Sequence, residues 1–214
     1  MSRHGRDRHR ATPNSRPHRV TAAGAQRALN SMRPSYRWLI LIPLGAALAA
    51  ISIWAVPGAK GIVGAGLALI MLAIAASDLR HLIIPNELNA AALALGLVNA
   101  ALDAPVVENL GTAVVRGAVA LLFFWGIRVA YRRWRGREGL GLGDVKLAFI
   151  AGVWLDWTLI AVAVEIAALT ALFAYGALFF FAKRQVSAAT RLPFGLFFAP
   201  AIWLSWLCGV WFSH

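Results

Sequence analysis

Residues 158–182 read TLIAVAVEIAALTALFAYGALFFFA, an almost wholly apolar run with one charged residue, Glu165. A helix that crosses a bilayer needs roughly 20 mostly apolar residues, so this run predicts a transmembrane helix. The rest of the chain has the same character, because hydrophobic residues make up 60% of its 214 residues and charged residues 14%. Soluble globular domains contain roughly 45–50% and 25%. The sequence therefore excludes an ordinary soluble protein and predicts a polytopic membrane protein.

Six further apolar segments flank this run. They cover residues 38–56, 62–77, 88–102, 109–127, 147–157 and 192–212. The first, fourth and last of these have spanning length on their own. The second reaches that length only if its helix continues through Asp78 towards Pro85. The fifth must either begin near Asp144 or be partly buried. We therefore predict an all-α, polytopic membrane helical bundle of about seven transmembrane segments.

Positive charge is concentrated at the amino end of the chain. The first 37 residues hold nine of the 21 Lys and Arg residues and lack apolar periodicity, which predicts a disordered basic tail to which we assign no function. The loops that follow 62–77, 109–127 and 158–182 are also basic, whereas the loops on the other side contain Lys60 as their only basic residue. The positive-inside rule therefore places the amino terminus in the cytoplasm.

Six charged residues lie within or against the apolar segments, where a charge is costly and suggests a function. They are Asp78, Glu87, Arg116, Asp144, Asp156 and Glu165. Asp78 closes one apolar segment and Asp144 opens another, and two crossings lie between them. Both carboxylates are therefore expected on the same, cytoplasmic, face of the membrane. For Arg116 and Glu165 we expect a structural ion pair, since unpaired charges at that depth would be expensive.

Two carboxylates brought together in a poorly hydrated site cannot both ionise easily, so they share a proton. The ionised member can then take a proton from water while the protonated member polarises a carbonyl. This is amide hydrolysis without a metal or a nucleophilic side chain. Two other interpretations stay open on the chemistry alone. Each aspartate could be an interfacial helix cap, or could pair with Arg80 or Lys146.

The residues around the two aspartates form distinctive patterns. Asp144 lies in GLGLGDVK (139–146), whose alternating glycines allow the backbone to bend and to approach a peptide closely just before a helix start. Asp78 lies in SDLRHLIIPNEL (77–88), in which the Pro–Asn pair ends the helix and turns the chain. A third segment, LPFG (192–195), opens the last apolar segment, where proline suits the first turn of a helix.

Together these three segments resemble the type IV prepilin peptidase (prepilin leader peptidase) family of GxGD aspartyl proteases. The matching pieces are D-x(6)-P-N, GxGD followed by Val–Lys, and P-F-G, and they occur in the family's order and spacing over about residues 62–212. Leu196 departs from the pattern, because many members have another proline there. Presenilin-like proteases share GxGD, but they end in a Pro-Ala-Leu motif that is absent here.

The resemblance implies a catalytic dyad of Asp78 and Asp144. The other matching residues are expected to bind the substrate or to support the active site: Gly141, Gly143, Lys146, Pro85, Asn86, Pro193, Phe194 and Gly195. The family cleaves the basic leader of type IV prepilin-like precursors at the cytoplasmic face of the bacterial inner membrane, in support of pilus or secretion-system biogenesis. No metal and no cofactor are expected.

Bifunctional members of the family carry an amino-terminal methyltransferase domain with paired CxxC motifs. Cys208 is the single cysteine of this chain, which therefore resembles the short, peptidase-only branch. On this basis we divide the chain into a basic cytoplasmic tail (1–37), an extra amino-terminal transmembrane helix (38–61) and a prepilin-peptidase-like membrane domain (62–214).

The expected partners are prepilin-like substrates and the lipid bilayer, with no nucleic acid and with an oligomeric state that the sequence leaves open. The alternative function is a small ion-coupled transporter or channel subunit that uses intramembrane charges, and Arg116, Asp156 and Glu165 motivate it. Such proteins normally show an internal inverted repeat. The two aspartate motifs are not copies of one another, which favours the peptidase.

Overall fold

A computed structural model of the chain describes residues 35–137, 139–182 and 193–212. The chain divides into two units, Met1–Ile40 and Leu41–His214, and the second contains nearly all of the described residues. Most of the predicted basic tail, up to residue 34, lies outside the described residues. The predicted disorder of the tail, and the division at residues 37 and 61, therefore stay predictions.

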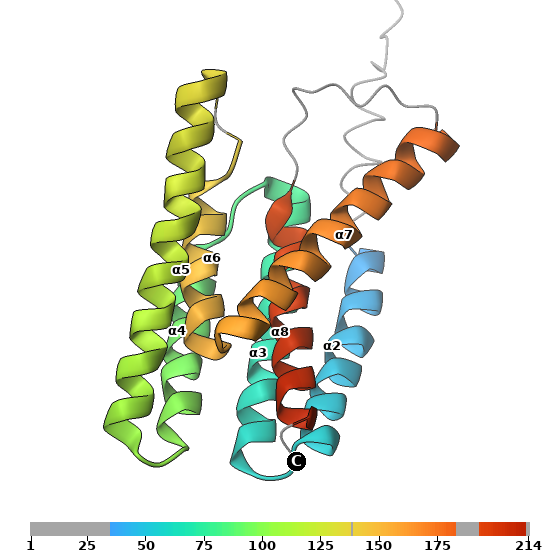
Figure 1. Ribbon diagram of the computed structural model, residues 1–214. Coiled ribbons are helices and arrows are strands. Elements are labelled where there is room, and N and C mark those ends of the chain that lie inside the picture. Colours follow the sequence, from blue (N-terminus) through green and yellow to red (C-terminus); the bar gives the residue numbers. More distant parts are fainter. Residues whose placement is uncertain (1–34, 138, 183–192, 213–214) are drawn as a thin grey trace, which may run out of the picture. The chain divides into compact units, whose positions relative to one another are not determined.

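The described residues form seven helices and no strand (Figure 1). They are α2 (Ser35–Ala55), α3 (Ala59–His81), α4 (Asn86–Ala101), α5 (Val106–Arg135), α6 (Leu142–Trp154), α7 (Trp157–Ala182) and α8 (Phe194–Phe212). Each matches one of the apolar segments in the sequence. The prediction of an all-α helical membrane bundle is confirmed, whereas the side of the membrane on which the amino terminus lies is not tested by the helices themselves.

Four of these helices, α3, α5, α7 and α8, are long and apolar enough to cross a bilayer. The chain is thus a multi-pass membrane protein. Helix α3 continues through Asp78 to His81, which is the extension that its spanning length required. The apolar part of α2 within the described residues is Leu39–Ala55, which is shorter than the spanning length that we expected for it.

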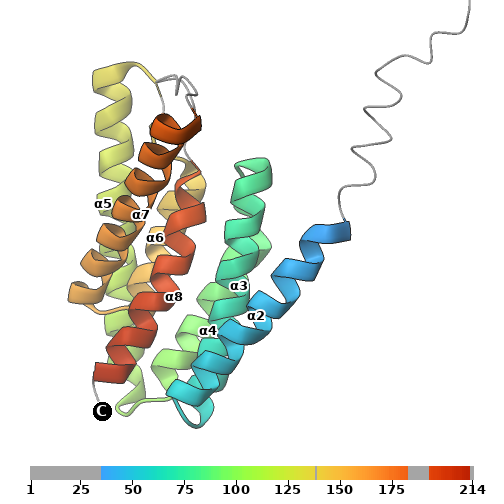
Figure 2. The ribbon, with the colours of Figure 1, turned by 90° about the vertical axis from the view of Figure 1, so that its right-hand side faces the viewer.

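Helix α6 has 13 residues and begins at Leu142, so that Asp144 lies in its first turn. Its side chains from Val145 to Leu155 are mostly buried, and they pack against α4, α5 and α8. Figures 1 and 2 show α6 alongside α5 and close to α8. Sequence analysis gave two alternatives for this short segment, a start near Asp144 or partial burial, and the helix shows both.

The central helices α3, α6 and α8 share one apolar core. Its largest fully buried side chains come from all three helices: Leu67, Met71, Ile74, Leu147, Ile150, Phe198 and Ile202. Helices α5 and α6 approach each other especially closely at Gly152. A Cβ atom there would lie 2.6 Å from the backbone oxygen of Arg116, so only glycine fits. This close approach lies near the carboxyl end of α6, opposite the end that carries Asp144.

A short turn connects α3 to α4. Leu82 adopts a left-handed conformation with φ of 53° and donates its backbone N–H to the carbonyl of Asp78. The hydroxyl of Ser77 donates to the carbonyl of Ile83 at 2.9 Å. Pro85 then precedes the first residue of α4, Asn86. These contacts end α3 one turn after Asp78.

Candidate active site

Asp78 and Asp144 come together at one end of the bundle. Asp78 lies in the last turn of α3 and Asp144 in the first turn of α6, and their exposed fractions are 6% and 7%. The two carboxylates are close enough to repel each other electrostatically. The topological inference that both would reach the same end of the helices is therefore confirmed. We call this region, formed by the end of α3 and the starts of α4, α6 and α8, the dyad end.

The first turn of α8 lies against both aspartates. The backbone N–H of Leu196 donates to Oδ2 of Asp78 at 2.9 Å, and the backbone of Gly195 lies close to both carboxylates. The first N–H groups of a helix lack partners within the helix, and the helix dipole favours negative charge there. The Pro193–Gly195 segment thus reaches the dyad, although more than a hundred residues separate it from Asp78.

Gly195 lies in close contact with two side chains. A Cβ atom there would lie 2.9 Å from Oδ2 of Asp78 and 2.9 Å from Cδ1 of Ile84. Its neighbour Phe194 packs its ring against that of Phe198, with centroids 5.2 Å apart. Pro193 accepts the N–H of Leu196 through its carbonyl. The P-F-G segment is therefore anchored in the core on one side and open to the carboxylates on the other.

The GxGD segment positions Asp144 through its own backbone. The N–H of Gly141, the residue before α6, donates to Oδ2 of Asp144 at 3.2 Å. A carboxylate at the third helical position that accepts the N–H of the cap residue is a standard way to fix a helix start. One of the two interpretations left open on the chemistry alone, a helix cap, thus describes this contact of Asp144, which uses one of its two carboxylate oxygens.

Ile84 fills the space between the three motifs. A Cβ atom at Gly143 would lie 3.1 Å from Cγ1 of Ile84, and the same side chain contacts Gly195. This residue was not among those expected at the site. The sequence does not distinguish it from its apolar neighbours Leu82 and Ile83, which are exposed, so only the packing reveals its role.

Lys146 connects two of the motifs directly. Its Nζ donates to Oδ1 of Asn86 at 2.8 Å, so that the first turns of α4 and α6 are joined. The sequence suggested that Lys146 could pair with an aspartate, whereas its observed partner is the amide of the Pro85–Asn86 segment. Through this bond, an exposed lysine fixes the start of α6, which carries Asp144, relative to the start of α4.

Arg128 is a second residue that sequence analysis missed. It lies in α5 with an exposed fraction of 8%, and its guanidinium donates to the carbonyl of Leu140 in the glycine-rich segment. A charged donor is a strong anchor for a backbone carbonyl. The available signal was a lone arginine in an otherwise apolar stretch of α5, separated from the basic cluster that ends the helix.

The charges at the other end of the bundle differ from expectation. The acidic group that faces Arg116 is Asp156, whereas Glu165 is exposed on α7, so the predicted ion pair between Arg116 and Glu165 is wrong. The reason is the packing of the helices, because α7 lies mainly against α8 and not against α5, which carries Arg116. Among the described residues, no cluster of three or more His, Cys, Asp or Glu side chains could hold a metal ion.

Comparison with known proteins gives the family. Residues 65–177, which include both aspartates, match the model of the type IV leader peptidase family. The chain belongs to this family. Its relatives include a prepilin leader peptidase/N-methyltransferase of Pectobacterium carotovorum, which is 32% identical over 77% of this chain and 57% of the relative. No solved structure matches the chain significantly.

Two Aeromonas proteins with the same name are also similar to this leader peptidase family member. The protein of Aeromonas salmonicida is 30% identical over 65% of the chain and 47% of its own length. The protein of Aeromonas hydrophila is 28% identical over 75% of the chain and 54% of its own length. The chain spans about half the length of the curated relatives that it matches.

Proposed function

We propose that the chain is an aspartic-type membrane endopeptidase that removes the basic leader peptide from type IV prepilin-like precursors at the cytoplasmic face of the bacterial inner membrane. Pilus or secretion-system biogenesis would be the process it serves. The single observation that carries the proposal is the meeting of Asp78 and Asp144, with the P-F-G backbone against both, in a chain of the type IV leader peptidase family.

In this proposal the two buried carboxylates share one proton. The ionised carboxylate accepts a proton from a water molecule as that water attacks the scissile carbonyl, and the protonated carboxylate donates to the carbonyl oxygen. The N–H groups of Gly141 and Leu196 hold one oxygen of Asp144 and one of Asp78 respectively. Each side chain is thereby oriented before the substrate binds, which lowers the entropic cost of the reaction.

The charge distribution supports a cytoplasmic location for the dyad. The last turn of α5, at the same end as the start of α6, carries Arg132, Arg133 and Arg135, and all three are exposed. The positive-inside rule assigns such a cluster to the cytoplasm. A precursor whose apolar helix lies in the bilayer would then present its leader junction at the depth of Asp78 and Asp144.

The decisive experiment is co-expression of the full chain with a tagged prepilin-like protein from the same genome. A gel shift compares the wild-type protein with Asp144→Asn and with the control Glu165→Gln, which changes an exposed carboxylate on α7 in the same chemical way. We expect a shortened product with the wild type and the control, and none with Asp144→Asn. Cleavage by a well-inserted Asp144→Asn protein would refute the proposal.

The transporter alternative receives less support from the arrangement of the helices. The charges that motivated it do not line a common path, because Glu165 is exposed on α7 while Arg116 and Asp156 face each other. Between the two ends of α3, the buried residues include Leu67, Met71 and Ile74, which form part of the apolar core. A polar route for ions would have to cross this core.

A further inference from the structure

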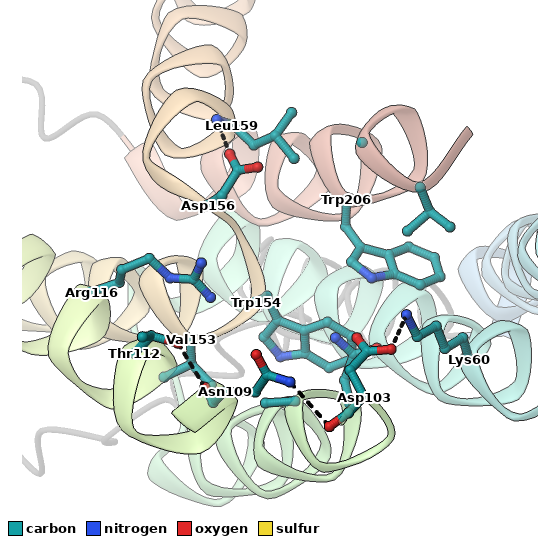
Figure 3. Close-up of a pocket in the computed structure, with 14 residues that line it drawn as sticks. Lys60, Asp103, Asn109, Thr112, Arg116, Val153, Trp154, Asp156, Leu159 and Trp206 are labelled. Atoms are coloured by element: carbon teal, nitrogen blue, oxygen red, sulfur yellow. Dashed lines mark hydrogen bonds and ion pairs between the residues drawn. The ribbon is translucent and has the colours of Figure 1, made fainter. Parts of the chain in front are cut away.

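A polar cavity lies at the opposite end of the bundle from the dyad (Figure 3). Its volume is about 310 Å³, and residues from α3, α4, α5, α6, α7 and α8 line it. Lys60 lines it from the first turn of α3, eighteen residues before Asp78, which corresponds to roughly 27 Å along a helix. This distal pocket therefore cannot contribute to the dyad by contact.

The distal pocket carries two cations and two carboxylates. Nζ of Lys60 lies 2.7 Å from the carboxylate of Asp103, and Arg116 faces Asp156. Asp156 also accepts the backbone N–H of Leu159 at 3.0 Å, so it caps the start of α7. The formal charge of the pocket is thus balanced, with one cation on each side of the Trp154 ring (Figure 3).

Two polar atoms of the pocket lack partners among the described residues. They are Nε of Arg116 and Oδ1 of Asn99, and both are buried. A buried donor or acceptor without a partner costs free energy, and it is normally satisfied by water or by a ligand. The guanidinium of Arg116 points into the pocket, from the same face of α5 as Thr112 and Asn109 (Figure 3). Arg116 and Asn99 therefore each contribute to the pocket lining a side chain with one polar atom that no described protein group uses.

The remaining walls of the pocket are apolar, and so is the surface around it. Trp206 and Val210 of α8 line one side. Exposed apolar side chains stand at the same end of the helices, including Val107 at the start of α5 and Trp157 at the start of α7. In a multi-pass membrane protein these side chains contact lipid. A ligand that reaches the pocket from the bilayer must then combine a charged group with an apolar body.

We propose that the distal pocket binds the headgroup of a phospholipid, with the phosphate on Arg116. Guanidinium is well suited to phosphate, since its planar set of N–H donors matches the phosphate oxygens. Asn99 and the two carboxylates then face the rest of the headgroup, and they suit an ammonium group. Because the pocket is formally neutral, a zwitterionic headgroup with one phosphate and one amine fits it better than a headgroup with net negative charge.

Native mass spectrometry of the full chain in detergent tests this proposal. Defined amounts of phosphatidylethanolamine or phosphatidylglycerol are added, and the bound lipid is counted. Parallel samples receive inorganic phosphate or glycerophosphoethanolamine, the water-soluble counterparts. The variant is Arg116→Gln, and its matched control is Arg132→Gln, which removes an exposed arginine from the other end of the same helix.

We expect one phosphatidylethanolamine per chain, bound at least about tenfold more weakly by Arg116→Gln and unchanged in Arg132→Gln, because a charge-assisted bond is lost. Phosphatidylglycerol should bind less well than phosphatidylethanolamine. Equal retention by Arg116→Gln and the wild type would overturn the proposal. Binding of inorganic phosphate or glycerophosphoethanolamine, with no binding of either lipid, would overturn the lipid assignment.

A second variant keeps the test decisive if Arg116→Gln does not fold. Asn99→Leu removes the unpartnered acceptor and leaves the phosphate-binding arginine in place. It should retain lipid but lose the preference for phosphatidylethanolamine over phosphatidylglycerol. An unchanged preference in a folded Asn99→Leu protein would contradict the assignment of the amine to this side of the pocket.

Discussion

The two ends of the bundle differ in how their charged side chains are held. At the dyad end, three charged groups have protein partners: Asp78 has Leu196, Asp144 has Gly141, and Lys146 has Asn86. At the distal pocket, Nε of Arg116 and Oδ1 of Asn99 are buried without partners among the residues that the structure describes. The helices are the same, so the difference lies in what each end offers to a ligand.

The difference fits the function that we propose for each end. A catalytic pair must be oriented before the substrate arrives, and backbone donors at helix starts achieve this without adding charge. A binding site instead retains unsatisfied groups whose cost the ligand removes. Arg128 and Arg116 illustrate this within one helix, since Arg128 donates to the Leu140 carbonyl whereas Nε of Arg116 donates to none.

The largest effect is expected from the carboxylates themselves. Asp78→Asn and Asp144→Asn should each lower the rate of leader cleavage by at least about a thousandfold, because neither amide can replace an acid or a base. The double variant should be no slower than either single variant, since residues that act as a unit are not additive. The measurement is single-turnover cleavage of a tagged precursor. Additive losses would show that the two residues act independently.

The next largest effect is expected at Gly195. In Gly195→Ala the new methyl group would lie 2.9 Å from Oδ2 of Asp78, so the carboxylate or the first turn of α8 must move. Misplacement of a catalytic group by about 1 Å can cost roughly a hundredfold in rate. The control is Gly176→Ala in α7, where nothing lies within 4 Å of the new atom.

The same cleavage assay reports both glycine variants, and insertion into the membrane is followed by blotting. Gly176→Ala should cleave at the wild-type rate, because alanine is at least as compatible with a helix interior as glycine. If Gly195→Ala also cleaves at the wild-type rate, the close contact between α8 and Asp78 has no part in the reaction.

The two arginines of α5 should differ in stability. Arg128→Met leaves the Leu140 carbonyl without its charged donor, and a hydrogen bond to a charged group contributes about 1.5–3 kcal/mol. We therefore expect its free energy of unfolding to fall by about 2 kcal/mol. Arg116→Met removes a donor that has no partner at Nε, and the carboxylate that faces it, Asp156, is exposed to solvent. In lipid-free detergent the variant should therefore lose less than about 1 kcal/mol.

Unfolding in a denaturing detergent, followed by the fluorescence of the tryptophans, measures both arginine variants. Adding phosphatidylethanolamine should widen the gap between wild type and Arg116→Met and leave the effect of Arg128→Met unchanged, because a ligand stabilises only the form that binds it. Equal losses in the two variants without lipid would remove the distinction between the two ends of the bundle.

The smallest effect is expected from the bond between Lys146 and Asn86. Both residues are exposed, and neither touches a carboxylate in the contacts described. Lys146→Met and Asn86→Ala should each lower cleavage less than about fivefold, with a coupling energy of about 0.5–1 kcal/mol in a double-mutant cycle. A loss as large as that of Asp144→Asn would instead assign Lys146 a direct part in the reaction.

Much of the dyad end could be predicted from the sequence, because its parts are encoded locally. Apolar runs fix the helices, and counting crossings places Asp78 and Asp144 at the same end. Glycines, prolines and asparagine mark where the chain turns. Ile84 and Arg128 escaped prediction for one physical reason. Their roles depend on which residues of distant helices pack against them, and no local pattern specifies such neighbours.

The sequence by itself determined that this protein is a helical membrane bundle, since hydrophobicity and segment length dictate membrane helices. Its resemblance to the leader peptidase family came from three short motifs. Only the tertiary structure decided the pairing of charges. It set Arg116 against Asp156 and exposed Glu165, brought the first turn of α8 to the aspartates, and left a polar pocket open at the far end. The physical reason is that side-chain partners depend on helix rotation and register, which the packing of the whole bundle sets.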